Sequence, residues 1–105
     1  MENSTVTLKG QEYKANLDFA ALGKVQTNLR KNDGLKLTFQ QLFAEVQEQN
    51  FAVVNEIVVQ SILRVHKQLK RENIEELLDL KELENVFTFV AELITNALPE
   101  ADKKK

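Results

Sequence analysis

Cysteine is absent from the 105-residue chain, and histidine occurs only once. The absence of thiols excludes disulfide bonds, cysteine nucleophiles and cysteine-based zinc sites, and it fits a reducing cytoplasm. The one histidine, His66, lies beside Lys67 in the sequence, and no nucleophile motif accompanies it. Because a catalytic histidine needs partner groups, we predict no catalytic residue, no cofactor site and no metal site, and we expect that the protein is not an enzyme.

A large excess of charge is also missing, because the net charge is −2. A general nucleic-acid-binding protein usually has a basic face, so we expect no nucleic-acid partner. The acidic residues between Glu75 and Glu84 lack the ligand spacing of a calcium loop and indicate a solvated helix face instead. Four cations gather near the end of a predicted helix, where the helix dipole favours positive charge. They are Arg64, Lys67, Lys70 and Arg71.

The sequence contains no apolar run long enough to cross a bilayer. The longest such run, Phe51 to Val65, is interrupted by Asn55, Glu56, Gln60 and Arg64. The polar start, Met1 to Ser4, has no signal-peptide pattern, and no membrane association is expected. With 43% hydrophobic residues, one ordinary globular domain can form. We predict a single domain over residues 1–98 and a charged, disordered tail over residues 99–105, in a cytoplasmic protein.

The first part of the domain has the alternating pattern of a β-hairpin, at about residues 5–17. Val6 and Leu8 lie on one face of the first arm, and Gly10-Gln11-Glu12 is predicted to form the turn. The second arm runs from Tyr13 to Leu17. Because a lone two-stranded hairpin is barely stable in water, we expect it to lie on the helices or to pair with another chain.

Helical periodicity and capping residues fill the rest of the domain. Asp18 is the predicted N-cap of the first helix, which the Asn32-Asp33-Gly34 turn ends, and Thr38 is the N-cap of the second. A third helix is predicted from Phe51 to about Leu69. Asn73 is expected to cap a short helix that reaches about Leu80, and a last helix follows to about Leu98, where Pro99 stops it. The predicted fold class is therefore α+β and mainly helical, with an N-terminal hairpin before a compact bundle of four to five helices.

The third and last predicted helices contain more apolar residues than one amphipathic stripe requires. Two explanations remain open at this point. Either these helices form a fully buried centre, or part of their surface meets a partner, because monomers rarely expose large apolar patches.

The opening of the chain resembles a known family. The run from Val6 to Leu22, VTLKGQEYKANLDFAAL, is similar to the start of phage tail assembly chaperones and related gene-transfer-agent proteins. Those proteins begin with a strand, a glycine turn, a strand with an aromatic residue, and a helix opened by a polar–Phe–x–x–Leu step. The resemblance covers about 17 residues, and the later helices match only in number, length and apolar character.

The resemblance implies a specific role. Such chaperones hold the tape measure protein, help to recruit tail tube subunits and are absent from the finished virion. Many are also made in a longer, frameshifted form, and Lys103-Lys104-Lys105 is compatible with the slippery codons that this requires. The resemblance therefore predicts a cytoplasmic phage or prophage tail assembly chaperone that acts in the host cytoplasm, with tape measure and tail tube proteins as partners.

An apolar groove for a helical partner is expected to lie on the leftover face of the two apolar helices. The candidate partner-binding residues are Phe51, Val54, Val58, Phe87, Phe89, Val90 and Ile94. Two other hypotheses stay open: a small non-enzymatic interaction or regulatory adaptor, for which a homodimer is an option, and a nucleic-acid-binding regulator that uses the four cations named above. The sequence does not fix the oligomeric state.

Overall fold

The N-terminal hairpin is closed by a two-residue turn. The computed structural model describes residues 4–97, and in it β1 (Ser4–Leu8) pairs antiparallel with β2 (Gln11–Ala15), with Val6 opposite Tyr13. Lys9 and Gly10 both have positive φ, 50° and 81°, as the twist of a two-residue hairpin loop requires. The expected three-residue turn over residues 10–12 is therefore wrong, because Gln11 and Glu12 already belong to β2.

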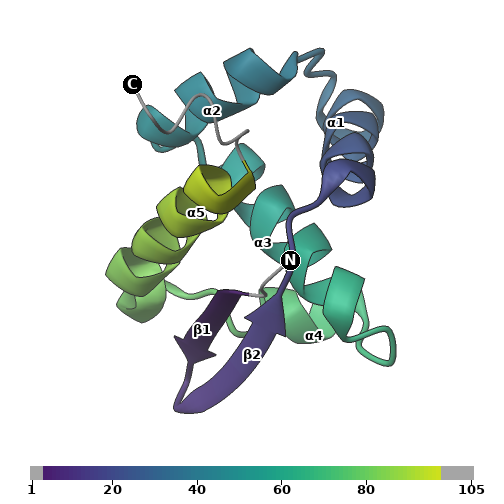
Figure 1. Cartoon of the computed structure of the whole chain (residues 1–105). Helices are drawn as coiled ribbons and strands as arrows, with labels where there is room; N and C mark the ends of the chain where they lie inside the picture. Colours follow the sequence, from purple (N-terminus) through teal and green to yellow (C-terminus); the bar gives the residue numbers. More distant parts are fainter. Residues whose placement is uncertain (1–3, 98–105) are drawn as a thin grey trace.

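The hairpin lies on the helices. Val6, Leu8 and Ala15 point into the core and are buried. β1 packs against α5 (Leu83–Ala97), and β2 packs against α3 (Phe51–Val65), so both strands sit along one side of the helical bundle (Figure 1). Asn85 Nδ2 also donates a hydrogen bond of 3.0 Å to the Thr7 carbonyl on the outer edge of β1. Packing against α3 and α5 thus stabilises a hairpin that would be marginal alone.

The first two helices begin at the residues that the sequence indicates. Asp18 caps α1 (Phe19–Asp33) by accepting a hydrogen bond of 2.9 Å from the Ala21 amide. Thr38 caps α2 (Phe39–Gln47), and its side chain and that of Gln41 each accept a hydrogen bond from the other residue's amide. Such reciprocal capping satisfies amide groups that have no partner within the helix.

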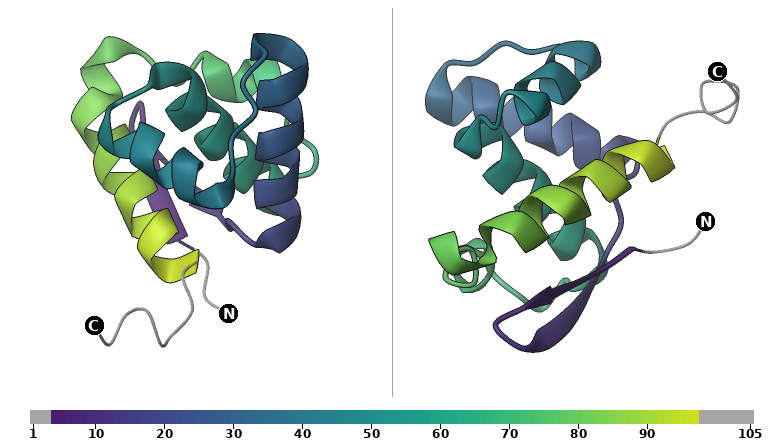
Figure 2. Two further views of the ribbon diagram at one scale, coloured as in Figure 1. Left: turned by 90° about the horizontal axis from the view of Figure 1, so that it is seen from above. Right: turned by 90° about the vertical axis from the view of Figure 1, so that its left-hand side faces the viewer.

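Helix α3 is the centre of the bundle. It contacts α1, α2, α4 (Arg71–Glu75), α5 and β2, and Figures 1 and 2 show it enclosed by these elements. Asn50 caps it through the Ala52 amide. The helix ends at Val65, earlier than the predicted Leu69, because His66 leaves the helical conformation with a ψ of 80°. Every residue from Val53 to Ile62 is buried except Asn55, which is half-buried.

The segment between α3 and α5 differs most from its prediction. Its helix α4 starts at Arg71, so Asn73 lies inside the helix rather than before it, and the Asn73 side chain accepts a hydrogen bond of 2.9 Å from the Lys70 amide. A 3₁₀ turn, η1 (Leu80–Glu82), then leads into α5.

Over residues 4–97 the structure confirms the predicted fold class of a mainly helical α+β domain, with an N-terminal hairpin followed by five α-helices. Pro99 and the predicted tail over residues 99–105 lie outside the described residues. No helix within residues 4–97 is both long enough and apolar enough to cross a membrane.

Candidate functional site

Four of the seven predicted partner-binding residues are part of the core. Val54, Val58, Phe89 and Val90 are each less than 5% exposed, so the prediction that they form an accessible surface is wrong. The reason is the central position of α3, whose apolar circumference is covered by helices and by β2. For these residues the explanation of a buried centre holds, and the surplus hydrophobicity of α3 and α5 mostly fills the core.

The other three predicted residues remain accessible to different degrees. Phe51 is 57% exposed, whereas Phe87 and Ile94 are half-buried against the core. The rings of Phe51 and Phe87 lie with their centroids 6.0 Å apart, a distance at which aromatic rings attract each other. The structure therefore brings Phe51 and Phe87 together at one end of α3 and α5.

A groove of about 400 Å³ opens beside this aromatic pair, and we call it the Leu80 groove. Its walls come from the first turns of α3 and α5 and from the segment that leads into η1. The residues that line it are Phe51, Val54, Asn55, Leu78, Asp79, Leu80, Leu83 and Val86. Leu80 is 78% exposed, although a side chain of this kind is more often buried.

Sequence reasoning missed Leu80 and its neighbours. Leu78 and Leu80 fell at the end of the short predicted helix and Leu83 near the start of the last one, and none of them was among the predicted partner-binding residues. In the structure α4 ends at Glu75, and η1 begins after Asp79. The Asp79 carboxylate accepts a hydrogen bond from the Lys81 amide at the start of η1. Asp is a favoured residue at such a start, and the Leu-Asp-Leu step was the available signal.

A second exposed aromatic group lies at the start of α1, and we call it the Phe19 patch. Phe19 is 81% exposed, and its ring meets the half-buried Phe39 ring edge to face, with centroids 6.0 Å apart. Phe19 directly follows the N-cap Asp18, so it projects from the first turn of the helix rather than from its core-facing stripe. Two separate apolar features are thus present on the described surface.

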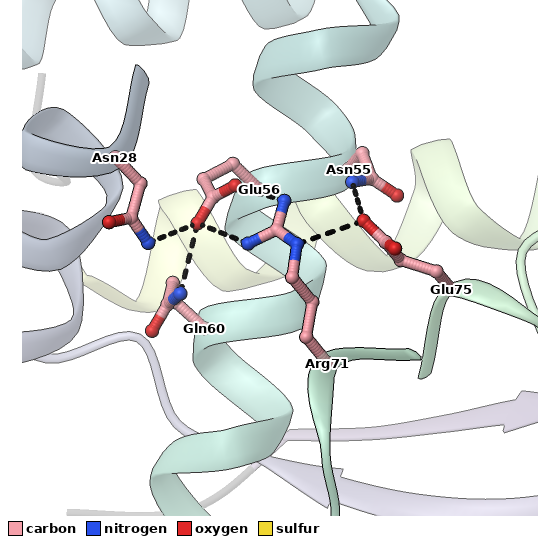
Figure 3. A network of polar contacts seen from close by, with 6 residues as sticks. All are labelled: Asn28, Asn55, Glu56, Gln60, Arg71 and Glu75. Carbon is pink, nitrogen blue, oxygen red and sulfur yellow. Dashed lines mark hydrogen bonds and ion pairs between the residues drawn. The ribbon is translucent and has the colours of Figure 1, made fainter. Parts of the chain in front are cut away.

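A buried carboxylate joins α1, α3 and α4. Glu56 on α3 is only 3% exposed, and four hydrogen bonds converge on it (Figure 3). Arg71 donates two of them, at 2.6 and 3.1 Å, Asn28 donates one at 2.8 Å, and Gln60 donates one at 2.9 Å. Arg71 also pairs with Glu75 at 3.0 Å. A buried charge is tolerated only with this kind of complete pairing.

Burial alone would raise the pKa of Glu56, because it penalises the charged form. The hydrogen bonds from Arg71, Asn28 and Gln60 and the positive charge of Arg71 outweigh that effect, and the pKa of Glu56 lies below its ordinary value. The same contact with Glu56 raises the pKa of Arg71. The carboxylate therefore stays ionised at neutral pH and fastens α4 to α3, which holds the segment that forms one wall of the Leu80 groove.

The four cations near the end of α3 do not form a free basic surface. Arg64 pairs with Asp18 at 2.8 Å, and Arg71 is engaged by Glu56 and Glu75. Half of the cations considered for a nucleic-acid contact are therefore neutralised by carboxylates within the fold.

His66 lies against another ring rather than in a polar cluster. Its ring meets Tyr13 edge to face at 6.0 Å, and its buried Nε2 has no hydrogen-bond partner. Between Ser4 and Ala97 no group of three or more acidic or histidine side chains is arranged to hold a metal ion. The described surface feature with the clearest capacity to bind something is the Leu80 groove, whose chemistry suits an apolar side chain.

Comparisons of this chain with protein-family models, with curated proteins and with solved structures found no match.

Proposed function

We propose that this chain is a non-catalytic, protein-binding domain of the phage tail assembly chaperone type, and that the Leu80 groove holds a helical segment of the tape measure protein. The observation that supports the proposal most directly is an open apolar groove with core residues Val54 and Val86 in its walls and exposed apolar side chains at its mouth. Phe51 and Leu80 are both more than half exposed, while the core residues around α3 are fully covered. Exposed apolar area of this kind is typical of protein-binding sites.

The dimensions of the groove suit a helix anchor. Helix-in-groove recognition places one or a few apolar side chains of an amphipathic helix into a preformed depression, and about 400 Å³ accommodates such side chains. Covering Phe51 and Leu80 would contribute roughly 1.5–3 kcal/mol for each side chain at most, before the cost of association is subtracted. We therefore expect single contacts of modest affinity, repeated along a long partner.

The resemblance of residues 6–22 to tail assembly chaperones supplies the identity of the partner in this proposal. A tail tube subunit is the second proposed partner. An adaptor outside any virus would use the same groove, and the two functions differ in the partner that is recovered.

The test is co-purification of the full chain with products of the neighbouring genes, followed by titration of overlapping peptides from any long helical protein recovered. We expect such a peptide to bind wild-type protein and to bind the Leu80→Ser variant at least about tenfold more weakly, which corresponds to about 1.4 kcal/mol. Phe19→Ser is the matched control, because it removes an equally exposed apolar side chain outside the groove and should bind the peptide at least as tightly as wild type does.

Two results would contradict the proposal. Equal peptide binding by wild type, Leu80→Ser and a Phe51→Ser/Leu80→Ser double variant would show that the groove is not the binding site. If the neighbouring genes are demonstrably expressed and no tape-measure or tube-like protein is recovered, the chaperone function is contradicted and the adaptor function replaces it.

A further inference from the structure

Charge is distributed very unevenly along the fold. From Phe19 to Lys36 the chain contains four basic residues and one acidic residue, whereas from Glu72 to Glu92 it contains seven acidic residues and one basic residue. The first set is Lys24, Arg30, Lys31 and Lys36, with Asp33. The second set is Glu72, Glu75, Glu76, Asp79, Glu82, Glu84 and Glu92, with Lys81. The overall net charge of −2 conceals this separation.

Each charged region contains one of the two exposed apolar features. The Phe19 patch lies in the basic region. Ala20, next to Phe19 in the chain, lines a hollow with Lys24 and Lys67, and Thr38, next to Phe39, lines another with Arg30 and Lys36. The Leu80 groove lies in the acidic region. Asp79 in its wall is paired with Lys9 at 3.5 Å, so the net negative charge there comes from the other carboxylates of the region. The start of α1 and the start of α5 lie on opposite sides of the molecule in Figures 1 and 2, so one chain cannot bring its own two features together.

We propose that the Phe19 patch of one copy docks into the Leu80 groove of a second copy, so that the chain self-associates head to tail. Phe19 is 81% exposed, and a cavity of roughly 150 Å³ is sufficient for benzene, so the groove has room for its phenyl ring. The Phe51 ring, which lines the groove, offers this phenyl ring a favourable edge or face contact. Lysines and arginines around the patch then face carboxylates around the groove, which favours this orientation.

The alternative symmetric pairings are disfavoured by the same charges. Patch against patch would bring Lys24, Lys36 and Arg30 of two copies together, and groove against groove would do the same with carboxylates. A contact between two different surfaces leaves each complex with one free patch and one free groove, so that association continues into chains or closes into a ring. A contact made by one aromatic side chain in one groove belongs to the weak, concentration-dependent class.

The experiment is sedimentation velocity of the full chain over a range of concentrations, with two single variants, Phe19→Ser and Leu80→Ser. We expect wild-type protein to grow beyond the dimer as its concentration rises. Each variant alone should stay monomeric, because it lacks one half of the contact. An equimolar mixture of the two should form a dimer and nothing larger, because one variant still has the groove and the other still has the patch.

Circular dichroism and thermal melting check that each variant is folded, and Phe19→Ala and Leu80→Ala replace any variant that is not. Association of wild type should also weaken as salt rises from about 0.01 M to about 1 M, where the screening length falls from roughly 30 Å to 3 Å. A monomeric wild type overturns the proposal. So does a mixture that remains monomeric, or a variant that still assembles as wild type does.

These readouts contain no other protein, so their failure is distinguishable from failure of the proposed function. If the self-association holds, Phe19→Ser is a monomer with an empty groove. If both proposals hold, a tape-measure peptide and the second copy compete for the same groove, and the peptide shifts wild type toward smaller species.

Discussion

Helix α3 and the segment from His66 to Glu82 are opposites in sequence and in structure. Helix α3 is rich in valine and isoleucine, which suggests a surface with apolar area to spare, yet from Val53 to Ile62 every residue except Asn55 is buried. The segment after it is strongly charged, which suggests simple solvation, yet it exposes Leu80 and forms a wall of the apolar groove. The difference teaches that the amount of apolar sequence predicts burial, whereas exposed apolar surface arises where the chain changes direction between elements.

Placing a charge in the centre of α3 should have the largest effect, and it tests whether this helix is the buried centre of the domain. Val58 is fully buried, so in Val58→Asp an unpaired carboxylate must be desolvated or the helix must leave the core. The cost should be on the order of 5 kcal/mol or more, comparable with the whole stability of a small domain. Loss of the cooperative thermal transition checks it. The matched surface variant Leu80→Asp should melt cooperatively, and a folded Val58→Asp would show that α3 is not central.

Removing the carboxylate that joins α3 to the segment should have the next largest effect. Glu56→Ala leaves Arg71, Asn28 and Gln60 without their common acceptor. Breaking a buried pair costs roughly 3–5 kcal/mol, and because Arg71 is 37% exposed and can turn toward water, we expect about 2–3 kcal/mol. Urea denaturation measures the difference. Glu75→Ala is the control, since its exposed contact with Arg71 should contribute under about 1 kcal/mol, and equal losses in the two variants would contradict a special role for Glu56.

The same carboxylate makes stability depend on pH. The pKa of Glu56 is lowered in the fold from its ordinary value of 4.5, and that of Asp18 from 3.8. For Asp18, burial opposes the shift, and the hydrogen bonds from the Ala21 amide and Arg64 outweigh it. A lowered pKa means that the stabilisation is complete above the unfolded-state value and is lost as pH falls through the folded-state value. The stability advantage of wild type over Glu56→Gln should therefore shrink as pH falls below 4.5, and a gap that widens on acidification would contradict the network.

The smallest expected effect on the free energy of unfolding concerns Leu80, the exposed residue of the segment after α3. Leu80→Ser removes an exposed side chain, so the free energy of unfolding should change by less than about 0.5 kcal/mol, whereas Leu42→Ser in the core should cost several times more. Thermal melts at a concentration where wild type is monomeric measure both. A large loss in Leu80→Ser would mean that Leu80 belongs to the core and that the groove is closed in solution.

Local chemistry made much of the fold predictable. The alternation of Val6 and Leu8 and the capping side chains of Asp18 and Thr38 act within a few residues, and the structure places these elements as the sequence indicates. Capping at Asn73 was misplaced because the same residue type serves inside the first turn as well as before it, where its side chain can accept the amide hydrogen bond of Lys70.

The candidate site could not be read in the same way. Glu56 and Arg71 are fifteen positions apart, and Asn28 is twenty-eight positions from Glu56, so their meeting depends on how three helices pack. Membership of the core also depends on neighbours: Val58 and Phe51 belong to the same apolar helix, but only Val58 has elements on every side. Periodicity gave the apolar stripe of α3 and could not show which of its residues would be covered.

The packing of β1 against α5 has a consequence for the order in which the domain is completed during synthesis. Thr7 meets Asn85, and Ser4 meets Asn96, so β1 is synthesised well before the helix α5 that covers its inner face. Until then a hairpin that is unstable alone exposes Val6 and Leu8, and closing so long a loop is entropically costly. The nascent chain therefore leaves β1 available to other proteins until α5 has been synthesised.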